Sequence, residues 1–187
     1  MNLDYWLQRA VGRATCRLGP QARLMPTARI RNIRGDGDCI VVGDNSVIRG
    51  ELLTFAHGGR IEIGAWCYVG EHTRIWSAAS VRIGDRVLIA HGVNIFDNLT
   101  HPVDPVARHS QIQEMFTRGH PRKLDLDERP VTIHDDAWIG AGAFVMRGLT
   151  IGARAIIAAG TVVTKDVADD TVVAGNPARV VKSILEA

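Results

Sequence analysis

Branched aliphatic residues recur along the chain with a period of six positions. Such a period matches neither the 3.6-residue repeat of an α-helix nor the two-residue alternation of a simple strand. It matches a short strand followed by a turn, repeated many times, with the branched side chain pointing inward. The fourteen positions that keep this spacing are Val42, Ile48, Ile63, Val69, Ile75, Ile83, Ile89, Ile95, Ile133, Ile139, Val145, Ile151, Ile157 and Val163.

Glycine and small side chains accompany this period. Glycine often follows the branched residue directly, as at Gly64 and Gly140, where we expect it to supply turn conformations that cost other residues energy. Four positions after the branched residue the side chain is usually small, as at Cys67, Thr73 and Ala143. Three strand–turn units make one triangular coil of about 18 residues, and stacked coils bury a continuous column of Ile and Val. The pattern predicts an all-β solenoid and disfavours a β-sandwich with chance spacing.

The two ends of the predicted stack need covering, because open strand edges invite association. Residues 2–18 have the apolar spacing of an amphipathic helix, whose basic face carries Arg9, Arg13 and Arg17. That face is typical of a solvated capping helix; contact with a membrane surface or an acidic partner is the alternative. At the other end, Pro177 is suitably placed to open a short helix through Leu185.

At 187 residues the chain has the size of one domain with a substantial core. We expect an N-terminal helical cap at 1–30, a β-helix at 40–167 with an inserted loop, and a C-terminal cap at 168–187. A net charge of +2 gives no argument for nucleic acid, and no apolar run reaches the length of a membrane span. Three scattered cysteines without a CxxC pair favour reduced thiols, so we expect a cytoplasmic protein without stable membrane insertion.

The longest break in the six-residue period follows Ile95, and the period resumes at Ile133 instead of residue 101. The inserted segment, about 97–130, is too charged to form a core, and Met115 and Phe116 are its candidate anchors. Long insertions in compact repeats are usually functional or disordered. We expect an arm that leaves one coil and reaches over a neighbouring subunit.

The most specific motifs lie near the end of the chain, where "VVTKDV" (162–167) and "AGNPARVV" (174–181) close the repeat region. Together with the hexapeptide period over residues 40–182, they make the chain resemble the hexapeptide-repeat acyltransferases, in particular the maltose, galactoside and polysaccharide O-acetyltransferases. This resemblance implies a left-handed parallel β-helix, although parallel crossover connections are usually right-handed. It also implies acetyl-CoA as co-substrate, a small-molecule or glycan acceptor, and a homotrimer with active sites between subunits.

A His-Pro pair, His101 and Pro102, stands where the insertion leaves the coils, and it matches the family's catalytic His-Pro. Transfer of an acyl group from a thioester to a sugar hydroxyl needs a base, and histidine titrates close enough to neutrality to serve as one. The alternative is that His101 only caps the turn before Pro102. Its second ring nitrogen needs an orienting partner, for which Asp97, Asn98, Asp104 and a backbone carbonyl are candidates.

The resemblance places acetyl-CoA along the last coils. Ala141 and Ala159 lie one coil apart and match family positions that contact the coenzyme, although simple packing would select alanine equally well. Trp138 is expected either to lie beside the coenzyme or the acceptor, or to pack between subunits. Cations near the adenosine end suit the phosphates, and surface solubility is the alternative reason for them. The matching positions there are Thr164, Lys165, Arg179 and, more loosely, Lys182.

Three other functions fit parts of the pattern. A zinc carbonic anhydrase on the same fold uses three histidines, two of them five residues apart, and no pair of histidines here has that spacing. We therefore expect no metal requirement. A catalytically inactive β-helix scaffold is disfavoured by the intact His-Pro pair, and an N-acetyltransferase of an amino sugar or antibiotic is the nearest enzymatic alternative. The sequence predicts an acetyl-CoA-dependent O-acetyltransferase acting on a sugar or surface-polysaccharide precursor.

Overall fold

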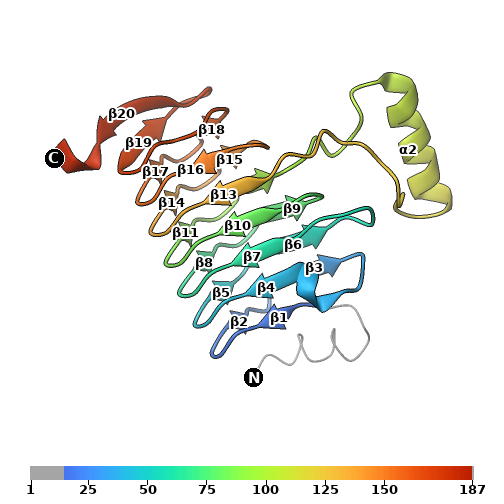
Figure 1. The fold of residues 1–187 in the computed structure, drawn as a ribbon, viewed down its shortest axis with the longest axis horizontal. Coiled ribbons are helices and arrows are strands. Elements are labelled where there is room, and N and C mark those ends of the chain that lie inside the picture. The colour runs from blue at the N-terminus through green and yellow to red at the C-terminus, as the bar shows by residue number, and fades with distance from the viewer. Residues whose placement is uncertain (1–14, 187) are drawn as a thin grey trace.

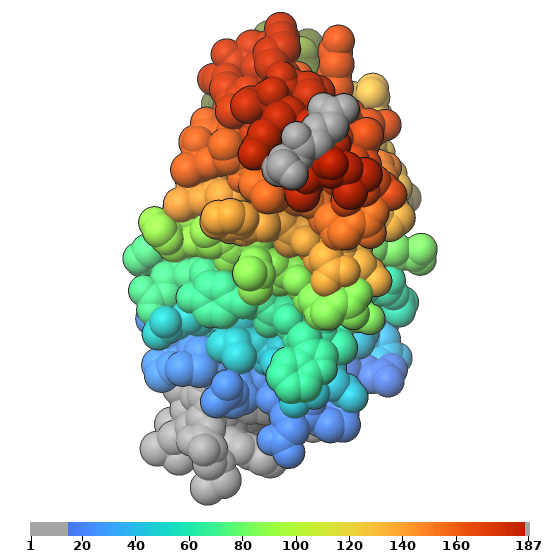
Figure 2. All heavy atoms as spheres, turned by 90° about the vertical axis from the view of Figure 1, so that its left-hand side faces the viewer, coloured from blue at the N-terminus to red at the C-terminus, as the bar shows by residue number. Residues whose placement is uncertain are grey.

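The computed structural model describes residues 15–186, which wind into a column of stacked coils (Figure 1). Successive coils contribute short strands to three sheets, and neighbouring strands in the described part of the chain pair in parallel except for the last two. In the space-filling view the coils form successive bands of colour from the N-terminal to the C-terminal end (Figure 2).

The three walls of the column are named here sheets A, B and C. Sheet A contains β1 (Arg17–Leu18), β4 (Ile40–Val42), β7 (Ile61–Ile63), β10 (Val81–Ile83), β13 (Val131–Ile133) and β16 (Thr150–Ile151). Sheet B contains β2 (Arg23–Leu24), β5 (Val47–Ile48), β8 (Tyr68–Val69), β11 (Leu88–Ile89), β14 (Trp138–Ile139), β17 (Ile156–Ile157), β19 (Thr171–Ala174) and β20 (Arg179–Ser183). Sheet C contains β3 (Arg29–Asn32), β6 (Glu51–Thr54), β9 (Arg74–Ser77), β12 (Asn94–Phe96), β15 (Phe144–Val145) and β18 (Val162–Val163). A short 3-10 turn, η1 (Gly37–Cys39), precedes β4.

The fourteen branched residues form the core, as their spacing predicts. Each of them is at most 4% exposed. The strand registers stack them coil upon coil: Ile83 pairs with Ile133 across the insertion, and Ile133 pairs with Ile151. The insertion therefore leaves the hydrophobic column unbroken. Polar residues at the corners are satisfied by the next coil, as where Thr73 Oγ1 donates to the Ala90 carbonyl at 2.7 Å.

The glycines that follow the branched residues are explained by the close approach of neighbouring coils. This differs from the expectation that they supply turn conformations unfavourable for other residues. A Cβ at Gly64 would lie 2.6 Å from the carbonyl carbon of Gly84, a distance that real Cβ atoms do not show. The left-handed backbone conformation falls instead on larger residues at the turns, such as Asn45 and Trp66, both with φ of 59°. Glycine is thus selected at these positions by lack of space rather than by its dihedral angles.

The first coil begins at Arg17, well before residue 40, where the β-helix was expected to start. Arg17 and Leu18 form β1 and not the end of a helix, and residues 2–14 of the predicted helix lie outside the described part of the chain. Leu18, Leu24 and Ile30 keep the six-residue spacing, with leucine in place of a β-branched residue at the first two positions. The expected helical cap at 1–30 therefore overlaps most of the first coil, which ends with β3.

The prediction of a short helix from Pro177 to Leu185 is wrong. Residues 179–183 form β20, which pairs antiparallel with β19, and only η2 (Ile184–Glu186) is a 3-10 turn. The β-branched pair Val180 and Val181 favours a strand, and β19 would otherwise leave its outer edge open. A hairpin rather than a helix thus covers the last coil of sheet B.

The insertion, predicted as a loop, contains a helix, α2 (Pro105–Thr117). Asp104 caps this helix by accepting a hydrogen bond from the Ala107 amide at 2.8 Å, and Pro105 occupies its first turn. Proline is favoured at that position, so it starts the helix instead of preventing it. Figure 1 shows α2 standing off to one side of the coils.

The returning part of the arm packs back on its own chain. The Leu99 amide donates to the Leu126 carbonyl at 3.0 Å, which joins the outgoing and returning segments of the arm. Leu126 is buried in a second small core with Leu53, Phe55 and Ala78, against which Trp76 and Leu124 pack. This core lies on the side of sheet C that faces the arm. Several of its residues also line the cavity described in the next section.

Candidate active site

Asp97 fixes the point at which the arm leaves the coils. Its carboxylate is fully buried and accepts hydrogen bonds from the Ser77 hydroxyl at 2.6 Å and from the amides of Ala78 and Ala79 at 2.8 and 3.0 Å. Asn98 also donates to it, at 2.9 Å. These bonds bind the carboxylate to the preceding coil, so Asp97 holds the root of the arm and is not placed as the partner of His101.

Asp127 fixes the returning end of the arm. Its side chain bonds Arg129 at 2.9 Å and also Arg147, whose Nε additionally donates to the Asp127 carbonyl at 3.0 Å. The guanidinium of Arg147, followed by that of Arg129, lowers the pKa of the Asp127 carboxyl. The arm is therefore tied to the coils at both ends.

His101 contacts Gln111 of α2, a partner that the sequence does not predict. Nδ1 of His101 lies 2.8 Å from Oε1 of Gln111, and the amide nitrogen of Gln111 donates to the Thr100 carbonyl at 3.2 Å. Gln111 is only 4% exposed, whereas the His101 side chain reaches solvent. The other predicted partners bond elsewhere: Asn98 accepts from the Thr100 amide at 2.8 Å, and Asp104 caps α2.

This arrangement determines which ring nitrogen of His101 is free. A carbonyl can only accept, so the Thr100 carbonyl requires the NH₂ group of Gln111 to point towards it. The amide oxygen then faces His101, and the neutral imidazole must carry its hydrogen on Nδ1. Nε2 is left with a lone pair, as a general base requires.

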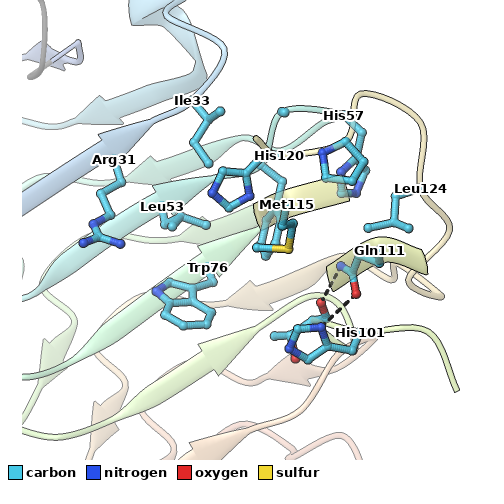
Figure 3. Close-up of a pocket in the computed structure, with 14 residues that line it drawn as sticks. Arg31, Ile33, Leu53, His57, Trp76, His101, Gln111, Met115, His120 and Leu124 are labelled. Atoms are coloured by element: carbon cyan, nitrogen blue, oxygen red, sulfur yellow. Dashed lines mark hydrogen bonds between the residues drawn. The ribbon is translucent and has the colours of Figure 1, made fainter. Parts of the chain in front are cut away.

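A cavity of about 360 Å³ opens beside His101 and Gln111 (Figure 3). Sheet C supplies one wall through outward-facing side chains of β3, β6 and β9, namely Arg31, Leu53 and Trp76. The arm supplies the facing residues Met115 and Leu124. Of the two predicted anchors, Met115 is half-buried and lines this cavity, whereas Phe116 is 82% exposed. The lining is mainly apolar, and its polar residues include Arg31, His57 and His120 besides His101 and Gln111.

Trp76 is held rigidly in this wall. Its indole Nε1 donates to Glu51 at 2.9 Å, and its ring stacks on Phe96 with centroids 5.0 Å apart. Farther along the cavity, His57 Nε2 lies 3.0 Å from Glu128 Oε1, which joins the loop after β6 to the returning arm. Two chain segments far apart in sequence therefore form one preorganised hollow.

The candidate coenzyme residues lie at the C-terminal end of the stack. Ala141 and Ala159 are one coil apart, as predicted: Ile139 pairs with Ile157, and the Gly160 amide donates to the Ala141 carbonyl at 2.8 Å. They occupy the turns between sheets B and C. Sheet C beside them exposes Phe144.

The remaining candidates flank the same end of sheet C. Thr164 and Lys165 are exposed and directly follow β18. The arm follows β12 in the same way, and β12 lies two strands away from β18 in sheet C. Arg179 lies in β20 next to a turn that rests on β18, because the Ala178 amide donates to the Val162 carbonyl at 2.9 Å. Lys182 is also exposed on β20 and pairs with Val172. Cations thus surround the last coil.

Trp138 lies on a different face. It is 51% exposed on the outer side of sheet B, in register with Leu88, which in turn is in register with Tyr68. The three side chains make an apolar strip along the sheet, defined here as the sheet B strip. A strip of this kind is typical of a surface that another protein chain covers.

Comparisons with known proteins agree with this architecture. Residues 130–165 match the family model described as "Bacterial transferase hexapeptide (six repeats)". The galactoside O-acetyltransferase of Escherichia coli is 35% identical over 143 residues, covering 76% of this chain and 63% of the relative. A Vibrio cholerae hexapeptide-repeat acetyltransferase, solved with acetyl-CoA, is 26% identical with a TM-score of 0.58, covering 98% of this chain and 80% of that chain.

These matches confirm the resemblance of the chain to the hexapeptide-repeat acyltransferases. A shorter match, of 57 residues at 53% identity, is to an N-acetyltransferase of tetrahydropyridine dicarboxylate from Staphylococcus aureus; it covers 30% of this chain and 24% of the relative. The predicted fold class, a left-handed parallel β-helix, is confirmed by the three parallel sheets and these relatives. The chain spans 59% and 63% of two of the curated relatives it matches.

Three further observations concern this hexapeptide-repeat chain. Within residues 15–186, no group of three or more metal-binding side chains is close enough to hold an ion. None of the helices in that range is long and apolar enough to cross a membrane. Its cysteines include Cys67, whose pKa is raised by burial, so this thiol is held away from the reactive thiolate form.

Proposed function

We propose that this protein is an acetyl-CoA-dependent O-acetyltransferase that acetylates a hydroxyl of a sugar or surface-polysaccharide precursor. The observation that carries the proposal is the state of His101, whose Nδ1 is engaged by Gln111 and whose Nε2 is available beside a cavity. Similarity to a galactoside O-acetyltransferase supports the same chemistry.

In the proposed reaction, Nε2 of His101 takes the proton of the acceptor hydroxyl as its oxygen attacks the acetyl carbonyl. The tetrahedral intermediate then breaks its carbon–sulfur bond, and the imidazolium returns the proton to the departing thiolate. Gln111 keeps the ring in the tautomer that can begin this cycle. Histidine is suited to both steps because it exchanges a proton close to neutral pH.

Acetyl-CoA binds, in this proposal, at the C-terminal end of sheet C. Small side chains at Ala141 and Ala159 let the pantetheine arm approach the backbone. Lys165 and Arg179 bind the phosphates by charge-assisted hydrogen bonds, with Thr164 and Lys182 beside them. The acetyl-CoA complex of the Vibrio cholerae relative supports the choice of coenzyme.

The acceptor occupies the cavity next to His101. Trp76 offers an aromatic wall that is held by Glu51 and Phe96, and such a wall suits the apolar face of a sugar ring. The arm closes the opposite side with Met115 and Leu124. A preorganised cavity of this kind contributes to the rate by fixing the hydroxyl near the base.

We further propose a homotrimer with active sites between subunits. The sheet B strip of Tyr68, Leu88 and Trp138 presents exposed apolar surface for a subunit contact. The arm exposes two more apolar side chains, Val106 and Phe116 of α2, which a neighbouring subunit can cover. Both features favour the interpretation of the insertion as an arm that reaches another copy.

An N-acetyltransferase is the second candidate, favoured by the short match to the Staphylococcus aureus enzyme. The test is release of free thiol from acetyl-CoA by the purified protein, with matched acceptors that differ in one group, such as glucose and glucosamine. We expect turnover with the hydroxyl acceptor. Turnover confined to the amine identifies the N-acetyl alternative, and absence of thiol release with sugars, amino sugars and nucleotide sugars contradicts both enzymatic proposals.

A further inference from the structure

A second hollow, of about 340 Å³, lies next to the cavity of His101. The two share three lining residues, Ile33, Ala56 and His120, so they form one continuous depression. Their chemistry differs sharply. The cavity at His101 is mainly apolar, whereas the second hollow is lined additionally by three arginines, Arg34, Arg118 and Arg122.

The three arginines come from separate places in the fold. Arg34 follows β3 in the first coil, Arg118 is the C-terminal cap of α2, and Arg122 lies in the returning segment of the arm. The hollow therefore forms only because the arm folds back towards the first coil. We name these three residues the arginine triad.

The arginine triad lacks carboxylate partners within residues 15–186, whereas nine other arginines in that range form ion pairs. Arg86 and Arg154, for example, form ion pairs with Asp136 and Asp170 at 2.7 and 2.6 Å. Guanidinium groups gathered without counter-charges repel one another and attract anions. Guanidinium also matches phosphate oxygens with paired hydrogen bonds, which makes it a preferred phosphate ligand.

We propose that the arginine triad binds a phosphate or pyrophosphate group of the acceptor, whose acetylated ring lies in the adjoining cavity beside His101. This deepens the proposed function and rests on it: the acceptor is a phosphorylated or nucleotide-linked sugar rather than a free sugar. One end of the acceptor is held by charge, the ring packs on Trp76, and the reacting hydroxyl faces Nε2. His120, shared by both hollows, adds a hydrogen-bond donor at the junction.

The phosphates of CoA are the other possible source of this anion, and the fold argues against them. Arg34 follows β3 and Lys165 follows β18, the two outermost strands of sheet C. With neighbouring strands roughly 4.8 Å apart, these positions in one chain are separated by roughly 24 Å along the stack. Two separate cationic regions suit two separate anionic ligands.

Inorganic pyrophosphate is the probe, measured by calorimetry on the full-length protein both without CoA and saturated with CoA. We expect one saturable site per chain, weakened about tenfold or more in the double variant R118Q/R122Q. R82Q, which changes an exposed arginine on the outer face of sheet A, is the matched control and should bind as the parent does. The double variant should keep the parental affinity for CoA.

Three results would overturn the proposal: no saturable pyrophosphate binding, equal binding by R118Q/R122Q and parent, or loss of pyrophosphate binding when CoA is present. The last result would assign the triad to the coenzyme. None of these measurements needs turnover, so they separate failure of this proposal from failure of the proposed enzyme activity.

A kinetic comparison then links the hollow to the acceptor. Galactose and galactose 1-phosphate differ only in the phosphate, and we expect the phosphorylated sugar to have a kcat/KM about tenfold higher or more. R118Q/R122Q should remove that preference and R82Q should keep it. Equal kcat/KM for the two sugars in the parent protein would contradict an acceptor phosphate site.

Discussion

At the scale of single residues, the pair His101 and Gln111 carries the proposed chemistry. A carboxylate partner would favour the protonated imidazolium, whereas the neutral amide of Gln111 selects a tautomer without adding a charge. The carbonyl of Thr100 fixes the amide, the amide fixes the ring, and burial of Gln111 prevents water from replacing it.

The role of Gln111 can be tested by two substitutions. Gln111→Glu places a negative charge opposite Nδ1, favours the imidazolium form and should move the acid limb of the pH–rate profile to higher pH. Gln111→Ala should lower kcat by about 10²-fold with little change in KM, because the ring is no longer oriented. Gln113→Ala, on the exposed side of α2, is the control. A Gln111→Ala enzyme with the parental kcat and pH profile would leave Gln111 without a positioning role.

At the scale of elements, the arm depends on its two anchors, Asp97 and Asp127. The first is a buried acceptor of several hydrogen bonds, and the second is an exposed ion-paired carboxylate. Between these points the arm supplies both Gln111 and one side of the cavity. Loosening either anchor is therefore expected to affect the position of His101 without unfolding the coils.

The Asp127 anchor should be sensitive to acid. Arg147 and Arg129 lower the pKa of the folded carboxyl, so its contribution is fully present above the unfolded value of about 3.9 and is lost as the pH falls through the lowered folded pKa. Asp127→Asn should reproduce this loss at neutral pH and speed hydrogen exchange in residues 124–130. Glu114→Gln, elsewhere on the arm, should leave exchange unchanged. Equal protection in Asp127→Asn and the parent would show that backbone contacts alone hold the arm.

The coils should tolerate changes on their outer faces far better than changes in the column. Ile133 is 1% exposed in β13, whereas its neighbour Thr132 points outward. Ile133→Asp buries an unpaired carboxylate and should cost several kcal/mol, about 3 or more, in the free energy of unfolding. Thr132→Asp should change it by less than about 1 kcal/mol. Similar melting temperatures for the two variants would mean that the assigned coil register is wrong.

The sequence predicts the coils well because their information is local. A branched residue every six positions specifies which side chain enters the core, and the confirmed burial of Ile83, Ile133 and Ile151 follows from that spacing alone. The first coil was missed for a physical reason. Leu18 and Leu24 keep the spacing but lack the β-branch, and the preceding apolar positions favour a helix.

The predictions that failed depend on contacts between distant segments. Pro177 suits the start of a helix, yet residues 179–183 form a strand because β19 provides an edge to pair with. Gln111 could not be identified because its contact with His101 requires α2 to be placed first. Arg34 meets the arm only after the chain has folded back to the first coil, so the arginine triad has no signature in the sequence.

At the scale of the whole molecule, subunit association is expected to follow the sheet B strip. Leu88 is 51% exposed at the middle of that strip, so Leu88→Asp should leave the fold of the chain intact while weakening the trimer. Sedimentation at micromolar concentration should show a trimer for the parent and for R82Q, and smaller species for Leu88→Asp. A parent protein that sediments as a stable monomer would contradict the proposed assembly.

The most direct test of the proposed chemistry is the turnover of His101→Ala, measured as thiol released from acetyl-CoA. We expect this variant to fold and to bind CoA as the parent does, because His101 lies on the arm and outside the hydrophobic column. Its turnover should fall by about 10²–10⁴-fold, the usual contribution of a positioned general base, while the control His109→Ala on the exposed arm stays near the parental rate. Near-parental turnover by His101→Ala would contradict the assignment of His101 as the base.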